Sequence, residues 1–230
     1  MLNLSPVPVI TLDGASGTGK GVVTHIVAKK LGWNLLDSGV LYRVLALSAL
    51  NQGIFIEDEA ALAALAKRLD VQFVATETGA PPHILLDKQE VTDTIRTEQI
   101  GNAASKAGAL PAVRAALLDR QRAFRTSPGL VTDGRDMGTV IFPDAIVKIF
   151  LTASPEERAL RRYNQLNAKG IHVNLGALVD ELRERDQRDQ ERSVAPLKPA
   201  VDAILIDTDP LTIEQVVARV MTEVEKKQPR

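Results

Sequence analysis

Short apolar runs alternate with longer amphipathic segments along most of the chain. The runs that read as buried strands are Val7–Leu12, Asn34–Asp37, Leu130–Asp133, Ile146–Leu151 and Ala203–Asp207. Helical spacing of apolar residues predicts helices over about 20–31, 40–51, 58–69, 97–106, 111–124, 155–167, 175–191 and 212–226. Such alternation is typical of a parallel sheet with helices packed on its faces. The pattern predicts an α/β fold with a mostly parallel, five-stranded sheet covered by helices on both faces.

One stretch departs from this alternation. Val71–Val74 and His83–Leu86 are strand-like, and the turn-forming residues Thr78–Pro82 separate them. Strand, turn and strand in this order predict an antiparallel hairpin. Because the rest of the chain alternates, we expect the hairpin to be a small insert rather than part of the main sheet.

A glycine-rich segment directly follows the first predicted strand and leads into the first predicted helix. Its spacing matches the phosphate-loop pattern G-x-x-x-x-G-K. Backbone N–H groups and a helix N-terminus then point at one place, which favours a bound phosphate. The lysine adds a positive charge for the outer phosphates of a nucleoside triphosphate. The predicted phosphate-binding residues are Gly14, Ala15, Ser16, Gly17, Thr18, Gly19, Lys20 and Gly21.

The residue after the lysine departs from the general pattern. Gly21 stands where Ser or Thr commonly binds magnesium, and Val22 cannot bind a metal either. Magnesium must therefore be held by other groups, with Ser16, an Asp elsewhere or water molecules as the candidates. Asp13, just before the loop, has either a structural role or a contact with magnesium-bound water.

Bulk composition excludes several classes of function. The chain has 230 residues, 45% of them hydrophobic, which suits one α/β domain with small inserts. The absence of cysteine rules out disulfides, thiolate metal sites and a cysteine nucleophile. A net charge of −1 and an aromatic content of 3% give no reason to expect a nucleic-acid partner. No long apolar run and no basic leader are apparent, so we expect a soluble, cytoplasmic protein with no membrane partner.

The predicted helix over 175–191 carries a face that begins apolar and ends charged. Leu178, Leu182, Arg185, Asp189 and Arg192 follow one another at steps of four, three, four and three residues. A solvated helix end with surface ion pairs would explain this face. A polar ligand explains it too, since arginine donates paired hydrogen bonds to phosphate and carboxylates accept from a base or sugar. More charged residues fall at a predicted strand end and on the neighbouring helix: Arg135, Asp136, Arg158, Arg161 and Arg162.

Three motifs together resemble the bacterial-type cytidylate kinase family, and the resemblance covers essentially the whole chain. They are Asp37-Ser38-Gly39 with Tyr42-Arg43, then Asp133-Gly134-Arg135-Asp136-Met137-Gly138-Thr139, then Arg185-Asp186-Gln187-Arg188-Asp189 with Arg192. Val22 stands where that family usually has Thr. The resemblance implies a phosphate-loop nucleoside-monophosphate kinase that transfers the γ-phosphate of ATP to CMP or dCMP.

The resemblance also implies roles for individual residues. Ser38, Arg185 and Asp189 would read the cytosine ring, and Asp133 or Asp189 would reach the sugar. Arg43, Arg135 and Arg192 would hold the acceptor phosphate, Arg114 would complete the site, and Arg161 and Arg162 would close over the transferring group. The implied CMP-binding set is Ser38, Tyr42, Arg43, Arg114, Asp133, Arg135, Asp136, Arg185, Asp189 and Arg192. The implied catalytic set is Lys20, Arg135, Arg161 and Arg162, with Arg158 beside ATP.

The same resemblance predicts how one kinase domain over 1–230 is organised and what it binds. The core is expected at about 1–38, 111–157 and 175–230, the monophosphate-binding region with its β insert at about 39–110, and a short helical lid at about 158–174. The expected partners are ATP with Mg²⁺, CMP and dCMP, and the expected state is a monomer. Two alternatives remain at this point: a kinase for another monophosphate such as UMP, and a nucleotide-switch binding module.

The remaining conspicuous residues have ordinary structural explanations. His25, His83 and His172 lack the spacing of metal ligands. Trp33 follows a helix-ending glycine and is expected to pack against the core. Asp207 and Asp209 follow the last predicted strand, where a turn or helix cap explains them better than a metal does.

Overall fold

The computed structural model describes residues 7–74, 76 and 82–227. The chain divides into two compact units. The first holds residues 7–36, Phe124–Glu191 and 195–227, and the second holds Asp37–Ala123 with Arg192–Val194. The predicted turn at Thr78–Pro82 falls largely, and the start Met1–Pro6 entirely, outside the described residues.

The first unit is built on a sheet in the strand order β2-β6-β1-β7-β8. The β6–β1, β1–β7 and β7–β8 pairs are parallel, which confirms the predicted α/β class and the five-stranded sheet. Its elements are β1 (Val9–Gly14), α1 (Lys20–Leu31), β2 (Asn34–Asp37), β6 (Leu130–Gly134), η2 (Met137–Ile141), β7 (Val147–Thr152), α6 (Pro155–Asn167), α7 (Leu175–Glu191), β8 (Ile204–Asp207) and α8 (Ile213–Lys227).

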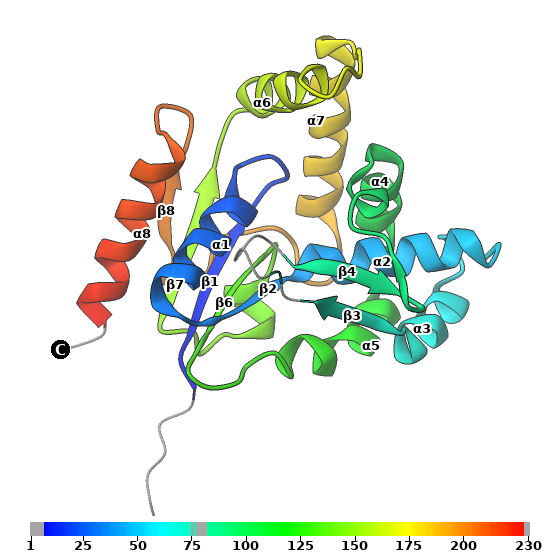
Figure 1. The fold of residues 1–230 in the computed structure, drawn as a ribbon, viewed down its shortest axis with the longest axis horizontal. Coiled ribbons are helices and arrows are strands. Elements are labelled where there is room, and N and C mark those ends of the chain that lie inside the picture. The colour runs from blue at the N-terminus through cyan, green and yellow to red at the C-terminus, as the bar shows by residue number, and fades with distance from the viewer. Residues whose placement is uncertain (1–6, 75, 77–81, 228–230) are drawn as a thin grey trace, which may run out of the picture. The chain divides into compact units, whose positions relative to one another are not determined.

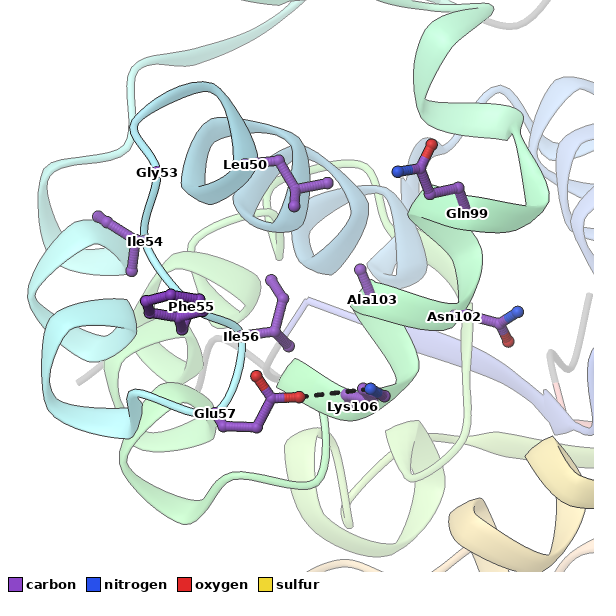
Figure 2. A pocket seen from close by; sticks show the side chains of 10 residues that line it. All are labelled: Leu50, Gly53, Ile54, Phe55, Ile56, Glu57, Gln99, Asn102, Ala103 and Lys106. Atoms are coloured by element: carbon purple, nitrogen blue, oxygen red, sulfur yellow. Dashed lines mark hydrogen bonds and ion pairs between the residues drawn. The ribbon is translucent and has the colours of Figure 1, made fainter.

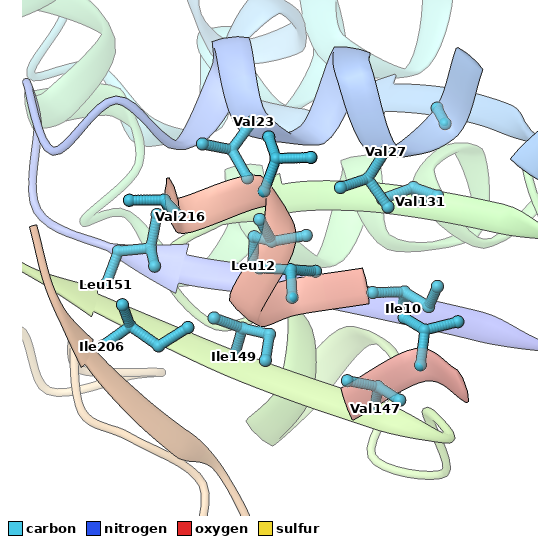
Figure 3. Close-up of a cluster of buried hydrophobic side chains, with 14 residues drawn as sticks. Ile10, Leu12, Val23, Val27, Val131, Val147, Ile149, Leu151, Ile206 and Val216 are labelled. Atoms are coloured by element: carbon cyan, nitrogen blue, oxygen red, sulfur yellow. The ribbon is translucent and has the colours of Figure 1, made fainter. Parts of the chain in front are cut away.

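Alternation along the central strand explains how this sheet is covered. Ile10 and Leu12 pack with α1 and α8 in one cluster of buried side chains (Figure 3), and α1 and α8 flank the sheet in Figure 1. Thr11 points the other way, toward the π-helical turn η2, where a Cβ on Gly138 would lie 2.8 Å from its Oγ1. Both faces of β1 are therefore covered, which is why all six of its residues are buried.

Two predicted packing features appear at the end of α1. The helix ends at Gly32, which has a positive φ of 65° that glycine adopts readily. Trp33 follows and is partly buried against the core cluster, as the sequence predicted. A Cβ on Gly129 would lie 2.3 Å from the Trp33 ring, so no larger residue fits there without a shift.

The second unit combines helices with a small antiparallel sheet of strand order β3-β4-β5. The β3–β4 pairing confirms the predicted hairpin, whereas β5 was not predicted, because a strand of two residues leaves no pattern. Its elements are α2 (Ser38–Asn51), α3 (Glu59–Arg68), β3 (Val71–Val74), β4 (His83–Leu86), β5 (Gln89–Glu90), η1 (Thr94–Arg96), α4 (Glu98–Ala107) and α5 (Pro111–Arg122). Helix α2 begins two residues earlier than predicted, because the Asp37 carboxylate accepts a hydrogen bond from the Val40 N–H and caps it.

Candidate functional site: a phosphate loop at the carboxyl ends of the strands

The glycine-rich loop connects the buried strand β1 to α1, as the sequence predicted. Gly14, Gly17 and Gly19 have φ values of 153°, 83° and 85°, a region that side chains with a Cβ rarely adopt. A Cβ on Gly14 would lie 2.4 Å from the Leu151 carbonyl oxygen of the neighbouring strand β7. The loop therefore needs glycine both for its turn and for its close approach to the sheet.

Three backbone carbonyl groups of this loop accept hydrogen bonds from side chains, some within the loop and some on other segments. The Ala15 carbonyl accepts hydrogen bonds from Lys20 Nζ at 2.9 Å and from Thr18 Oγ1 at 3.1 Å. The Ser16 carbonyl accepts from the Arg158 guanidinium at 3.0 Å. The Thr18 carbonyl accepts from Thr208 Oγ1 at 3.4 Å. Because a trans peptide is planar, holding each carbonyl also fixes the N–H of the next residue in the opposite direction.

Asp13 anchors the turn that follows β6. Its two carboxylate oxygens accept hydrogen bonds from the Met137 and Gly138 N–H groups, each at 2.8 Å. Burial raises the pKa of Asp13 to about 6, with a smaller upward contribution from the Asp136 charge, although the two N–H donors and Lys20 act in the opposite direction. This supports the structural explanation of Asp13 and links the phosphate loop to the Asp133–Thr139 motif.

Arg135 and Asp189 were predicted from separate motifs and lie in contact. Arg135 Nε donates to Asp189 Oδ2 at 2.7 Å, and Arg135 Nη1 donates to the Gly134 carbonyl at 3.2 Å. Burial opposes the charged form of Arg135, but the charges of Asp189, Asp133 and Asp186 outweigh it, so the pKa of Arg135 is raised. Arg135 therefore stays protonated, and its contact with Asp189 joins the end of β6 to helix α7.

Helix α6 carries the three predicted arginines of the lid and the ATP site. Arg158 is 2% exposed, and its guanidinium binds the Ser16 carbonyl and the Asp186 carboxylate. Arg161 donates to the Thr208 carbonyl at 2.7 Å and to Glu157 at 3.1 Å. Arg162 is half-buried on the same helix. Asp186 had no predicted role; its spacing of four residues from Leu182 was the signal that it shares a helix face with a packed residue.

Predicted acceptor-site residues also occur in the second unit. Arg43 donates to the Ile95 carbonyl at 2.6 Å, which ties α2 to η1. The Arg114 guanidinium lies 5.9 Å from the centre of the Tyr42 ring, within the range of a cation–π contact. Ser38 is buried at the first position of α2.

The predicted residues are thus divided between the two units of the chain. The first unit contains Gly14–Gly21, Asp133, Arg135, Asp136, Arg158, Arg161, Arg162, Arg185 and Asp189. The second unit contains Ser38, Tyr42, Arg43, Arg114 and Arg192.

An open pocket of about 530 Å³ lies within the second unit and contains none of the predicted residues (Figure 2). Its lining is mostly apolar, with Phe55 at its edge, and the Lys106 ammonium there is paired with Glu57 at 3.3 Å. A nucleotide needs several donors for its phosphates. We therefore assign the site by the phosphate loop and not by this pocket.

Neither a metal-ligand cluster nor a membrane-spanning helix occurs in the described residues. No cluster of three or more His, Asp or Glu side chains suited to a metal occurs in 7–74, 76 and 82–227. Asp209 instead accepts hydrogen bonds from the Ser154 N–H at the start of α6, and Asp207 accepts from the Asp209 N–H, so both stabilise turns. Over that same part of the chain, every helix is too short or too polar to span a membrane.

A glycine-rich loop between a central parallel strand and a helix, with the buried Arg158 bound to the loop, defines a nucleotide-binding protein of the phosphate-loop class. The family model described as cytidylate kinase matches residues 10–226. The chain therefore belongs to the cytidylate kinase family.

Individual relatives agree with this family. The chain is 60% identical over 221 residues to a cytidylate kinase of Pseudomonas aeruginosa strain UCBPP-PA14, covering 96% of both chains. It is 60% identical over 217 residues to a cytidylate kinase of Pseudomonas fluorescens strain Pf0-1, covering 94% of this chain and 95% of the relative. An uncharacterised protein from Eubacterium ventriosum, 10% identical, shares the fold with a TM-score of 0.52, covering 96% of this chain and 99% of its own. The family match and the two cytidylate kinases confirm the resemblance predicted from the three motifs, and the solved structure shows the fold alone.

Proposed function

We propose that this chain transfers the γ-phosphoryl group of ATP to CMP or dCMP. A phosphate oxygen of the monophosphate bonds to the γ-phosphorus while the bond from that phosphorus to the bridging oxygen of ATP breaks. The products are ADP and CDP or dCDP. The single observation that carries this proposal is the match to the cytidylate kinase family over residues 10–226, which include both the phosphate loop and the Arg135–Asp189 pair.

The residues supply alignment and charge rather than covalent chemistry, as phosphoryl transfer requires. We assign the ATP phosphates to the loop Gly14–Gly21, whose geometry suits an anion and which includes Lys20. Arg135, Arg161 and Arg162 neutralise charge on the transferring group. Arg158, predicted beside ATP, binds the Ser16 carbonyl of the loop and the Asp186 carboxylate.

We assign CMP to residues of both units without specifying how those units are arranged. Arg43, Arg135 and Arg192 hold the phosphate, and Asp133 or Asp189 reaches the sugar. The remaining members of the set are Ser38, Tyr42, Arg114, Asp136 and Arg185, with Ser38, Arg185 and Asp189 reading the base. Cytosine offers a ring acceptor and an amino donor, whereas uracil reverses that pattern. Groups arranged for one base are therefore left unpaired by the other.

Magnesium enters this reaction with ATP. In kinase sites Mg²⁺ is commonly held by one or two carboxylates, substrate phosphates and water. Ser16 is the candidate protein group in the loop, because both carboxylate oxygens of Asp13 already accept backbone N–H groups. When bound, the ion neutralises charge on the β- and γ-phosphates.

Other expectations extend the proposal. We propose that 158–174 acts as a lid that excludes water during transfer, that about 39–110 binds the monophosphate, and that the remaining ranges form the core. A monomeric state and a cytoplasmic location stay predictions. The nucleotide-switch alternative is not favoured, because the chain belongs to a family of kinases.

The test measures ADP formation from ATP with each nucleoside monophosphate in turn. We expect CMP and dCMP to be accepted, and kcat/KM for UMP to be lower by about 10⁴. ATP without an acceptor gives the hydrolysis background and serves as the control. Equal kcat/KM values for UMP and CMP would contradict the proposed base recognition, and no transfer to any monophosphate would contradict the proposed activity.

A further inference from the structure

Arg158 is the largest side chain among the fully buried residues of the described chain, although it carries a positive charge. Its guanidinium donates to Asp186 Oδ1 at 3.1 Å, to Asp186 Oδ2 at 2.5 Å and to the Ser16 carbonyl at 3.0 Å. Its Nε is shared between the Ala153 carbonyl at 3.1 Å and the Ser154 carbonyl at 3.3 Å. One planar group thus joins the phosphate loop, the start of α6 and helix α7.

The contact with Ser16 has a direct consequence for the loop. Because the Ser16–Gly17 peptide is planar, fixing its carbonyl toward Arg158 turns the Gly17 N–H to the opposite side. Arg158 also packs against Gly17, where an added Cβ would lie 3.2 Å from the Arg158 Cβ. The neighbouring carbonyls of Ala15 and Thr18 are held by Lys20 and Thr208. The orientation of these successive N–H groups is therefore imposed by side chains, with Arg158 and Thr208 acting from outside the loop and Lys20 from within it.

Burial of this arginine depends on Asp186. A buried guanidinium loses its hydration, and only a carboxylate in good geometry together with further acceptors compensates for that loss. Asp186 supplies both oxygens and is 15% exposed, so the pair is largely removed from water. Without Asp186, Arg158 would be drawn toward water and away from the Ser16 carbonyl.

We propose that Asp186 is a positioning residue for phosphoryl transfer, holding Arg158 against the Ser16 carbonyl so that the Gly17 N–H is fixed for ATP phosphates. This inference rests on the proposed function for its substrate. Arg158 then acts on ATP through the loop rather than by contacting it. Since Asp189 lies one turn further along α7 and binds Arg135, the same helix supports both the phosphate loop and the end of β6.

The first experiment replaces Asp186 with Asn, which keeps the shape but removes the charge. We expect the KM for ATP and the dissociation constant of MgATP without acceptor to rise about tenfold, because hydrogen bonds to charged groups have about that effect. The KM for CMP is expected to change less than about threefold. If the dissociation constant of MgATP stays within about twofold of the original chain, the proposal is wrong.

A matched control joins the same two helices. Arg183 of α7 donates to Glu156 of α6 at 2.5 Å, but both side chains are 57% exposed. We expect Arg183→Gln to leave the KM for ATP within about twofold, because an exposed ion pair contributes little. An equal effect of Arg183→Gln and Asp186→Asn would overturn the proposal, since general loosening of the helix pair would explain both.

A second variant separates positioning from folding. The double substitution Arg158→Met with Asp186→Leu replaces the buried pair by apolar side chains, which commonly restores stability. We expect Tm to recover while ATP affinity stays low, because nothing holds the Ser16 carbonyl. Recovery of both would show a purely structural pair and overturn the proposal.

Two outcomes need separate readouts. If Asp186→Asn does not fold, Arg158→Lys tests the same contact. Lysine keeps the charge, but its ammonium group cannot bind the Asp186 carboxylate and the Ser16 carbonyl together as the planar guanidinium does. Unchanged MgATP binding in Arg158→Lys would overturn the proposal. If the original chain binds MgATP but phosphorylates no monophosphate, the proposed function fails while the binding comparison still decides the role of Asp186.

Discussion

Charged side chains are buried at the strand ends of the first unit but exposed on the small sheet of the second unit. Asp13 and Asp133 at the strand ends, and Asp189 of α7, which binds Arg135 there, are each 4% exposed. On the small sheet, the His83 and Glu90 side chains pair at 2.5 Å but are 52% and 54% exposed. One region buries ionisable groups in contact with backbone and one another, and the other leaves them in water.

We interpret this difference as one between charges that serve the proposed function and charges that only face water. Burying a charge opposes folding unless partners compensate for the lost hydration, so such groups contribute little net stability and need another reason to be present. An exposed pair such as His83–Glu90 contributes little to stability, and its presence needs no functional explanation. The contrast predicts that substitutions at the strand ends and beside the phosphate loop change activity or its pH dependence, and that substitutions on the small sheet do not.

The largest expected effect is at Arg162, which is half-buried on α6. We expect Arg162→Ala to lower kcat by about 10³, because an arginine that stabilises the transition state of phosphoryl transfer is worth at least that much. Binding of CMP at equilibrium is expected to change less than about threefold. Steady-state kinetics and CMP titration measure the two, with the exposed Arg219→Ala of α8 as the control. Turnover within threefold of the original would contradict the lid role.

The next effect is the pH dependence introduced by Asp13. Its pKa in the folded chain is raised from 3.8 to about 6, so the folded state binds the proton more tightly than the unfolded state. The stability that this proton contributes is fully present below about pH 3.8 and is lost as the pH rises through about 6. The free energy of unfolding of the original chain, relative to Asp13→Asn, should therefore fall by about 2–3 kcal/mol over that range.

Urea unfolding of both proteins between about pH 4 and about pH 7.5 measures this difference. The comparison cancels the titration of every group that the two proteins share. A difference that stays constant over the range would show that the pKa of Asp13 is the same in the folded and unfolded chains, which would contradict this prediction.

The smallest expected effect is on the small sheet. The hydrogen bond from His83 lowers the pKa of Glu90, with a second contribution from Thr92, but the carboxylate stays exposed. We expect Glu90→Gln to change Tm by less than about 2 °C and to leave kcat/KM unchanged, because solvent screens the pair. Thermal unfolding and the CMP assay test this. A large loss of activity would place a functional charge in the region that we describe as surface.

Local spacing made much of the fold predictable. Lys20–Leu31 was predicted with its observed ends, because an apolar face and a terminating glycine are both visible in the sequence. The β3–β4 hairpin was predicted from two strand-like runs, whereas β5 and the π-helical turn at Met137–Ile141 were not. That turn depends on Asp13, which lies more than a hundred residues earlier and accepts its N–H groups.

The sequence by itself determined the class of protein. The strand, the glycine-rich loop and the lysine follow one another within one short segment. The charged motifs resemble those of the cytidylate kinase family. Only the tertiary structure decided which charges are buried and what holds them. Arg158 and Asp186 are 28 residues apart, and Ser16 is 142 residues from Arg158. Burial and hydrogen-bond geometry arise when distant segments pack together, so no local pattern could show that this arginine orients the phosphate loop from behind.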